Sequence, residues 1–342
     1  YTGEDTLSLH DALPICKVAT PIYYEFKHTK FPKGTVVDRN GFENPEWGEI
    51  DFEDTFFGEG TNKWMLKAST GERGAAIEIF SNLDELDLFL NLFLTGFNYC
   101  YLMYSTYGPE HSCSPSLIPG VKSEDKTRVM TFPTFVIQKY MEKPQLIEGC
   151  KHTLRLYGLY SQEEKGYVYE EWYTGLSGLK FDLKSTNYIC HLTNMDFSQN
   201  IPEDKESASF HCKSKKDTLK QVKISEEQNI EIVKFIFESM VRDGTSLLNP
   251  IGMAGVFELL GFDILYDAND KAWLIEINDC PDLYGRGDDY YDPFAQRMLE
   301  DKFKLTIDKI FPIPENGFRR GKNFSFLDYP DDKNLWIQVC ED

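Results

Sequence analysis

Three oxygen-bearing side chains stand close together in an otherwise apolar stretch of the chain. Asp263, Glu276 and Asn278 belong to the segment VFELLGFDILYDANDKAWLIEIN, residues 256–278. Carboxylate and amide oxygens are the ligands that a hard cation such as Mg²⁺ prefers in proteins, and nucleotide phosphates often complete its coordination. The three residues are therefore candidate ligands of a magnesium–nucleotide complex.

A β-hairpin is the element that must position these side chains. Two apolar runs, 257–267 and 272–278, flank the polar turn Ala-Asn-Asp-Lys, a pattern typical of two antiparallel strands. A four-residue loop gives the register Asp267 with Ala272, Leu265 with Leu274, and Asp263 with Glu276. Because strand side chains alternate with a period of two, Asp263, Glu276 and Asn278 are expected on one face.

The charge on this face admits two interpretations. The hairpin places no Lys or Arg of its own there, and a buried carboxylate is costly unless a cation pairs with it. A bound metal ion would supply that charge. The same spacing is equally typical of solvated groups on the outer face of a one-sided sheet.

Several motifs resemble one known family. WLIEIN, with GFDILYD before it and Asp279, Cys280 and Pro281 after it, resembles the end of the ATP-grasp domain in the tubulin-tyrosine ligase and ligase-like family. CHLTN at 190–194 matches a second motif of that family, and VIQKYMEKPQLIEG extends the resemblance, which runs from about residue 63 to about residue 283. The resemblance implies an α+β ATP-grasp fold in which two α/β lobes sandwich a nucleotide. It also implies ATP and Mg²⁺ as cofactors, and ATP-dependent joining of an amino acid to a protein carboxylate, such as a tubulin tail, through an acyl phosphate.

The resemblance also assigns roles to individual residues. Asp263, Glu276 and Asn278 would hold the metal, and Lys151 and Arg155 of KHTLRLYGLY would be catalytic cations that neutralise the phosphates. The residues expected around the nucleotide are Lys67, Arg73, Gly74, Gln138, Lys139, Tyr140, Met141, Lys151, His191, Thr193 and Asn194. Taken alone, Lys67 is more typical of an exposed lysine on a hairpin, and 135–144 of a core strand.

Three positions depart from the family pattern and motivate other hypotheses. Thr153 stands where the family has Asp, Ala76 replaces a glycine, and YVYEEWYTG lacks an expected arginine. These departures favour a second hypothesis, a catalytically impaired nucleotide-binding pseudoenzyme that serves as an interaction module. The acidic charge motivates a third, a ligase for a small-molecule or non-tubulin acceptor.

Composition excludes some classes of partner. The formal net charge of -20 over 342 residues argues against nucleic acid and anionic membranes, because both need a positive surface. No apolar run reaches the about 18 residues of a membrane span. The eight cysteines contain no CxxC pair, which favours free thiols in a reducing, cytoplasmic setting. Lys213, Lys215, Lys216 and Lys220 are expected in a solvated loop.

The remaining pattern gives the domain organisation. Residues 1–16 are expected to be an artefact or disordered, since they resemble translated sequencing adapter, and 17–62 form a short, truncated N-terminal segment. Residues 63–145 are expected as a central ATP-grasp lobe and 146–342 as a C-terminal lobe. Helices are predicted from Ser81, over 225–242 with Ser225 and Gln228 as a capping box, and over 288–311. A loop is predicted over 201–222, and the tail from 312 shows no clear periodicity.

Overall fold

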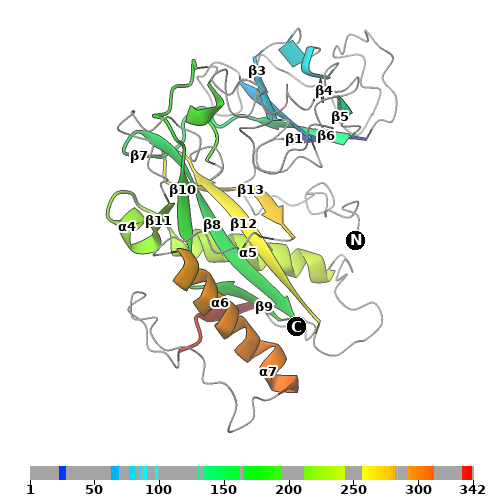
Figure 1. Cartoon of the computed structure of the whole chain (residues 1–342), viewed down its shortest axis with the longest axis vertical. Coiled ribbons are helices and arrows are strands. Elements are labelled where there is room, and N and C mark those ends of the chain that lie inside the picture. The colour runs from blue at the N-terminus through cyan, green and yellow to red at the C-terminus, as the bar shows by residue number, and fades with distance from the viewer. Residues whose placement is uncertain are drawn as a thin grey trace, which may run out of the picture. The chain divides into compact units, whose positions relative to one another are not determined.

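A computed structural model gives the fold (Figure 1). It describes residues 23–27, 63–68, 77–81, 85–86, 88–90, 97–98, 129–130, 134–161, 165–185, 187–193, 212–242, 256–279, 281, 283, 291–311 and 333–340. The described residues divide into two compact units, the first holding 23–151 and 176–193, the second 152–175 and 212–340. The expected lobe boundary at 145/146 lies six residues before the first crossing at 151/152, and residues 176–193 group with the first unit.

The first unit is built on a four-stranded sheet with the order β1-β6-β2-β3. The predicted hairpin of WMLKA and AAIEIF is confirmed, since β2 pairs antiparallel with β3 from Trp64↔Phe80 to Lys67↔Ile77. Leu86 and Leu90 of the predicted helix after Ser81 are helical and buried. The elements of this unit are β1 (Tyr23–Lys27), β2 (Trp64–Ala68), β3 (Ile77–Phe80), β4 (Phe97–Asn98), β5 (Val129–Met130), β6 (Thr134–Lys139), β7 (Leu146–Ile147) and the 3₁₀-helix η2 (Tyr188–Cys190).

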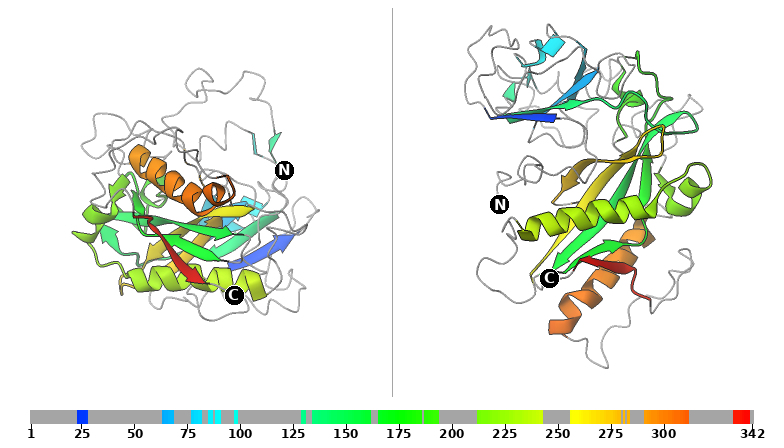
Figure 2. Two further views of the ribbon diagram at one scale, coloured as in Figure 1. Left: turned by 90° about the horizontal axis from the view of Figure 1, so that it is seen from below. Right: turned by 180° about the vertical axis from the view of Figure 1, so that it is seen from behind.

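A sheet with the central order β11-β10-β8-β12-β13 forms the second unit, and β9 joins β8 to β14. Helices α5 and α6 cover its two faces (Figures 1 and 2). The bounds are β8 (Cys150–Ser161), β9 (Gly166–Tyr169), β10 (Tyr173–Leu176), β11 (Cys212–Ser214), α4 (Lys215–Leu219), α5 (Glu226–Arg242), β12 (Phe257–Tyr266), β13 (Ala272–Asn278), α6 (Tyr291–Leu305), α7 (Ile307–Ile310) and β14 (Trp336–Cys340). Together with the antiparallel sheet of the first unit, this arrangement is α+β, as predicted.

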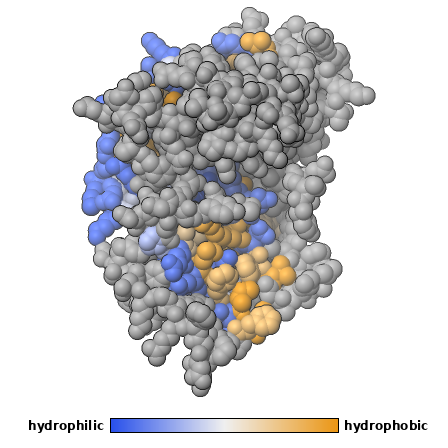
Figure 3. All heavy atoms as spheres, in the orientation of Figure 1, coloured by the Kyte–Doolittle hydropathy of each residue, from blue (hydrophilic) through white to orange (hydrophobic). Residues whose placement is uncertain are grey.

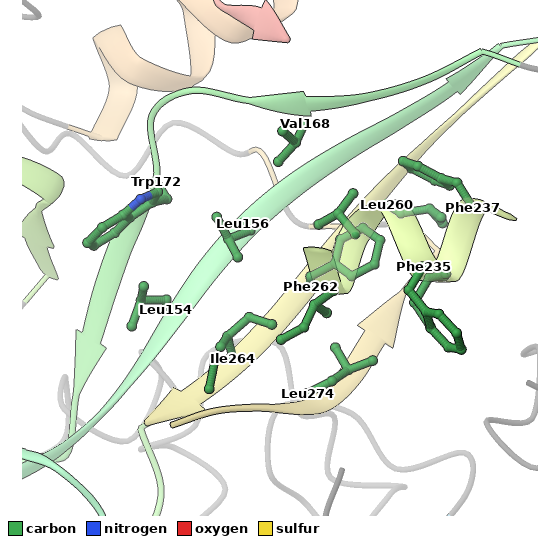
Figure 4. Packing of buried hydrophobic residues seen from close by; sticks show 14 of the residues in the cluster. Leu154, Leu156, Val168, Trp172, Phe235, Phe237, Leu260, Phe262, Ile264 and Leu274 are labelled. Carbon is green, nitrogen blue, oxygen red and sulfur yellow. The ribbon is translucent and has the colours of Figure 1, made fainter. Parts of the chain in front are cut away.

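Alternation along the strands separates two apolar layers. Leu154 and Leu156 of β8 lie beside Phe262 and Ile264 of β12 in the cluster that packs against α5 (Figure 4). The predicted apolar stripe of α5, Ile232, Val233, Ile236, Phe237 and Met240, is buried in the same cluster. On the opposite face, Phe294 of α6 contacts a group of tyrosine rings, Tyr157, Tyr169 and Tyr173.

The predicted hairpin exists, and its register contains a β-bulge. Asp263 pairs with Glu276 and Gly261 with Asn278, which confirms that Asp263, Glu276 and Asn278 share a face. The pairs expected nearer the turn are wrong: Ala272 lies opposite Tyr266, and Leu274 opposite Ile264. The register shifts between Asp263 and Ile264, so β13 carries one extra residue, Ile275.

The turn is shorter than the four residues expected. The backbone N–H of Asp267 donates to the Lys271 carbonyl, leaving 268–270 as the loop, and Asp270 adopts φ 61°. The carboxylate of Asp267 accepts hydrogen bonds from the backbone of Asn269 and Lys271 and from the Trp273 indole, at 2.8–3.1 Å. These bonds hold the left-handed residue that a tight turn needs. A short turn and a later bulge therefore offset each other, which is why the Asp263–Glu276 pairing was predicted correctly.

The capping box at α5 is confirmed in part. Ser225 Oγ accepts from the Gln228 backbone at 3.2 Å, as predicted. The Gln228 side chain instead accepts from the Ala272 backbone at 2.8 Å and donates to the Asp270 carbonyl at 3.0 Å. The Ser225 backbone N–H donates to the Tyr266 hydroxyl. The start of α5 is thus attached to the hairpin turn.

Four other expectations change in the second unit. Residues 212–219 are β11 and α4 rather than a loop, and Lys215 is not solvated, since its Nζ lies 2.6 Å from the Glu170 carbonyl and 3.1 Å from Glu226. The helix expected over 288–311 is divided at Thr306 into α6 and α7. The tail contains a strand, β14, that pairs with β9.

A buried ion pair attaches the segment before β14 to α6. Arg297 Nε lies 2.9 Å from Asp301 Oδ2, and both side chains are almost fully buried. The Asp301 carboxylate also accepts from the Leu335 backbone at 3.2 Å, while Arg297 donates to the Lys333 carbonyl.

Apolar side chains gather in the lower part of the face that carries α6 (Figure 3). Exposed ones near the end of α6 and at the end of α7 include Phe303, Ile310 and Phe311. In the part of the chain described, no helix has the length and apolar character needed to span a membrane. Cys150, Cys190 and Cys340 carry free thiols.

Candidate active site

The polar cluster of the second unit is built on three neighbouring strands. Strand β8 pairs antiparallel with β12, which puts Arg155 directly opposite Asp263. Arg155 Nε donates to Asp263 Oδ1 at 2.5 Å and Nη2 donates to Oδ2 at 3.0 Å. This two-point contact fixes the plane of the carboxylate.

The cation on this face comes from a strand outside the hairpin. The hairpin carries none, but β8, more than 100 residues earlier in the chain, supplies Arg155. The two side chains are only 20% and 14% exposed, so their charges are partly withdrawn from water and interact more strongly than surface charges do.

The other predicted metal ligands adjoin this pair. Asn278 Nδ2 lies 3.4 Å from Asp263 Oδ2 and 3.5 Å from Glu276 Oε1, so the three predicted side chains converge. Glu276 is exposed, whereas Asp263 and Asn278 are half-buried. Among the described residues, no group of three or more His, Cys, Asp or Glu side chains is arranged to hold a metal. A metal here would take two carboxylates and the oxygen of a rotated Asn278 amide, an all-oxygen set that suits Mg²⁺.

Gly261 makes room for the arginine. It lies two residues before Asp263 on the same face of β12. A Cβ atom at this position would lie 3.0 Å from Pro281 Cβ, 3.2 Å from Arg155 Nη1 and 3.3 Å from Arg155 Cδ, closer than ordinary packing allows. The absence of a side chain at Gly261 thus lets the Arg155 guanidinium lie against the strand.

Burial and like charge perturb the acid at the centre. Burial raises the pKa of Asp263 and the nearby Glu276 carboxylate raises it further, while Arg155 opposes both effects. The pKa of Arg155 lies well above its ordinary value; burial opposes that rise, and the Asp263 charge outweighs it. A site in which two carboxylates approach each other favours a bound cation.

A second polar cluster lies in the first unit around Lys151. Its Nζ is 3.4 Å from the Tyr140 hydroxyl and 4.5 Å from the centre of the Tyr140 ring. The hydroxyl lies 2.8 Å from His191 Nδ1, and His191 Nε2 lies 2.9 Å from the Ser185 carbonyl. The residues predicted from two separate motifs, 135–144 and 190–194, therefore meet at one lysine.

The local turns explain how these residues meet. Glu148 and Gly149, with φ 55° and 85°, form the two-residue turn between β7 and β8, and so place Lys151 just after it. Ser177 then exchanges two hydrogen bonds with the Lys151 backbone, its N–H donating to the carbonyl and its Oγ accepting from the N–H. Helix η2 ends at Cys190, immediately before His191.

All three titratable groups of this cluster are perturbed by burial. Burial, together with the positive charge of Lys67, lowers the pKa of Lys151 to about 7. Burial lowers the pKa of His191 and raises that of Tyr140 well above its ordinary value. His191 and Tyr140 are thus neutral at neutral pH, and the charge of Lys151 is adjustable there.

The other residues predicted to bind the nucleotide lie in the first unit or outside the described residues. Gln138 and Met141 are buried, Lys67 and Thr193 are half-buried, and all four lie in the first unit. Arg73, Gly74 and Asn194 fall outside the described residues, as does the side chain of Lys139. Thr153 lies on β8 between Lys151 and Arg155 and is half-buried.

Sequence reasoning missed some residues of the two clusters. Ser177 and Ser185 act through the Ser177 hydroxyl and through backbone atoms, and no motif identified them. Gly261 stands inside the GFDILYD motif, but the sequence assigned it no role. Glu142, whose carboxylate accepts from the Lys63 backbone at 2.6 Å, stands inside the motif that was recognised. Its position two residues after Tyr140 could have identified Glu142 from the sequence.

Comparison with known proteins agrees with this description. The model of the Tubulin-tyrosine ligase family matches residues 43–316. The probable tubulin polyglutamylase TTLL9 of Bos taurus is 29% identical over 197 residues, which cover 54% of this chain and 41% of that protein.

Two further relatives bear names for different modifications. The probable tubulin–tyrosine ligase PBY1 of Saccharomyces cerevisiae is 24% identical over 271 residues, 72% of this chain and 34% of that protein. Tubulin glycylase 3B of Tetrahymena thermophila is 26% identical over 182 residues, 51% of this chain and 15% of that protein. The chain spans less than half the length of each of these three relatives. Because the family model matches four-fifths of the chain, the chain belongs to the tubulin-tyrosine ligase family.

Proposed function

We propose that this chain is an ATP-dependent ligase of the ATP-grasp type that joins an amino acid to a carboxylate of a protein, with a tubulin tail as acceptor. The observation that carries the proposal is the convergence of Asp263, Glu276 and Asn278 beside Arg155. The relatives named above are a polyglutamylase, a tyrosine ligase and a glycylase of tubulin, and membership of their family supports a ligase.

The proposed reaction has two steps. An oxygen of the acceptor carboxylate attacks the γ-phosphorus of ATP, the bond from that phosphorus to the β–γ bridging oxygen breaks, and ADP leaves. The amine of the incoming amino acid then attacks the acyl carbon, the C–N bond forms, and inorganic phosphate leaves with the acyl oxygen while the amine loses a proton. Both steps move negative charge between oxygens, so fixed cations and oriented donors stabilise them most.

Each named residue has a defined task in this proposal. Asp263, Glu276 and Asn278 hold Mg²⁺, which when bound withdraws charge from the phosphate oxygens. Arg155 acts through Asp263, whose carboxylate plane it fixes, and is therefore a positioning residue. Lys151, with Lys67 nearby, binds a phosphate oxygen through its ammonium group.

The test measures ADP release and incorporation of labelled glutamate, glycine or tyrosine into tubulin by the 342-residue chain. Glu276→Gln should remove turnover, because it deletes a ligand without deleting the Arg155 pair. Glu238→Gln on α5 is the matched control, since it removes the same charge from an exposed position elsewhere. Undiminished turnover in Glu276→Gln would disprove the metal assignment.

A second candidate function follows from Thr153. It replaces a family carboxylate on the strand that carries Lys151 and Arg155, which favours a nucleotide-binding pseudoenzyme that acts as an interaction module. In that case Mg-ATP raises the melting temperature, because a ligand of the folded state stabilises it, but no acceptor or amino acid leads to ADP release. A further screen with small-molecule carboxylates tests the third hypothesis: ADP release with such an acceptor, but not with tubulin, would distinguish a ligase for a non-tubulin acceptor from the tubulin ligase and from the pseudoenzyme.

A further inference from the structure

The hydrogen bonds around Lys151 have a fixed direction. The Ser185 carbonyl can only accept, so His191 Nε2 must carry the proton that bonds it at 2.9 Å. His191 is neutral because burial lowers its pKa, so its Nδ1 is an acceptor. The Tyr140 hydroxyl therefore donates its one proton to Nδ1 at 2.8 Å.

This direction determines what Tyr140 offers to Lys151. With its proton committed to His191, the Tyr140 oxygen presents lone pairs to the Lys151 ammonium, 3.4 Å away. The chain of donors runs from Lys151 to Tyr140 to His191 to Ser185. Every member except the ammonium has its polar atoms engaged within the protein, and His191 is 1% exposed.

The same residues restrict where the ammonium can lie. The Tyr140 ring stacks under Nζ at 4.5 Å, and Ser177 holds the Lys151 backbone from both sides. The edge of the His191 ring is held in turn between Tyr140 and Phe181, in contacts close to perpendicular. A long, flexible side chain is thereby confined before any ligand arrives, which lowers the entropy cost of binding.

We propose that Tyr140 and His191 are positioning residues. They hold the Lys151 side chain in place and favour its protonated, ammonium form, which binds an anionic phosphate ligand. The family resemblance implied that these two side chains lie around the nucleotide, whereas both nitrogens of His191 are bonded within the protein. This inference rests on the nucleotide-binding part of the proposed function, and its chemical test does not require nucleotide.

The charges that face the three groups set the direction of the effect. Lys67 disfavours the charge on Lys151, and Cys190 favours it. Glu142 and Cys190 face Tyr140, while Lys63, Asp182 and Lys151 itself face His191. Deleting the Tyr140 hydroxyl changes none of these neighbouring groups, so any shift in the Lys151 titration reports the loss of that one acceptor.

Tyr140→Phe is the central variant. It removes the acceptor and retains the ring beneath the ammonium. Because an acceptor stabilises the charged form, its loss should move the titration of Lys151 downward by about one pH unit, the low end for a long hydrogen bond to a charged group. His191→Leu should shift it in the same direction by less, and His191→Asn, whose amide oxygen can replace Nδ1, should restore most of the wild-type value.

Tyr266→Phe is the matched control, since it also removes a buried hydroxyl, one that bonds Ser225 and Asn229 in the second unit. The chemical readout is the pH dependence of Lys151 acetylation by a trace of acetic anhydride, followed by mass spectrometry on the folded, nucleotide-free chain. The binding readout is the Kd of Mg-ATP between pH 6 and 9.

The expected result is a lowered Lys151 titration in Tyr140→Phe, no shift in Tyr266→Phe, and a loss of ATP affinity about fivefold greater at pH 8 than at pH 6. An unchanged Lys151 titration in folded Tyr140→Phe overturns the inference, and so does an equal shift in Tyr266→Phe. If Tyr140→Phe does not fold, the His191→Leu and His191→Asn pair decides by the same criterion. A shifted titration in a protein that binds no Mg-ATP would retain the positioning role and reject the proposed function.

Discussion

Asp263→Asn and Glu276→Gln each delete one negative charge from the same cluster, and they should differ sharply in their effect on stability. Asp263 is bound by Arg155 through two hydrogen bonds, at 2.5 and 3.0 Å, and is mostly buried. Glu276 is exposed. Both carboxylates are proposed metal ligands, but only Asp263 is bound by Arg155 and so contributes strongly to the stability of the fold.

The magnitude follows from the contacts. A hydrogen bond to a charged group contributes about 1.5–3 kcal/mol. The amide of Asp263→Asn keeps one acceptor for Arg155, so about one charged bond is lost and the arginine is left with an uncharged partner. We expect the free energy of unfolding to fall by about 2–3 kcal/mol, less than the about 3–5 kcal/mol of a fully buried pair, because Arg155 and Asp263 remain 20% and 14% exposed.

Glu276→Gln should change the free energy of unfolding by no more than about 0.5 kcal/mol, as surface substitutions usually do. Urea unfolding of both variants, followed by far-UV circular dichroism under reducing conditions, measures the difference. Equal destabilisation by the two substitutions, or a loss below about 0.5 kcal/mol in Asp263→Asn, would refute the assignment of Asp263 as the structural member of the cluster.

Three further outcomes are expected. Gly261→Ala should destabilise by about 1–3 kcal/mol in urea unfolding, because its Cβ would lie 3.0 Å from Pro281 Cβ and 3.2 Å from Arg155 Nη1; unchanged stability would mean that neither residue requires the glycine. Asp301→Asn should cost about 3–5 kcal/mol, since it leaves Arg297 buried without its charge partner, and full retention of the thermal midpoint would contradict this. The pKa of Lys151 is about 7 in the folded chain and 10.5 in an ordinary setting, so the unfolded chain binds an extra proton between these values and the free energy of unfolding should rise with pH across that window. Lys151→Met should remove a rise of about 3–5 kcal/mol from the difference between pH 7 and pH 10, and a parallel pH profile in the two proteins would disprove it.

Local patterns predicted the elements that hold the candidate site. Alternation and turn residues identified the hairpin and the Asp263–Glu276 pairing, and the capping serine identified the start of α5. These features depend on residues within about fifteen positions of one another, the range over which periodicity carries information.

Features that depend on distant segments were not predictable in the same way. Arg155 lies opposite Asp263 only because β8 and β12 pair in a specific register, and the chain between them gives no sign of it. Strand β14 pairs with β9 across more than 160 residues, and its exposed Ile337 and Gln338 interrupt the alternation that would have identified it. Lys215 lies in a lysine-rich stretch typical of a loop, but it contacts Glu170 and Trp172 of the segment that joins β9 to β10.

The extra residue in β13 has a consequence for how this chain tolerates insertions and deletions. Leu274 faces the apolar core beside α5, and in a regular strand Glu276, two residues later, would face the same core. The bulge at Ile275 turns Glu276 to the opposite face, and a deletion of Ile275 would keep it there, because Leu274 and Glu276 would then be consecutive residues of a regular strand. A one-residue gap at Ile275 between relatives would therefore leave the faces of the site unchanged, and alignments through it must be anchored on the Asp263–Glu276 pair rather than on the turn.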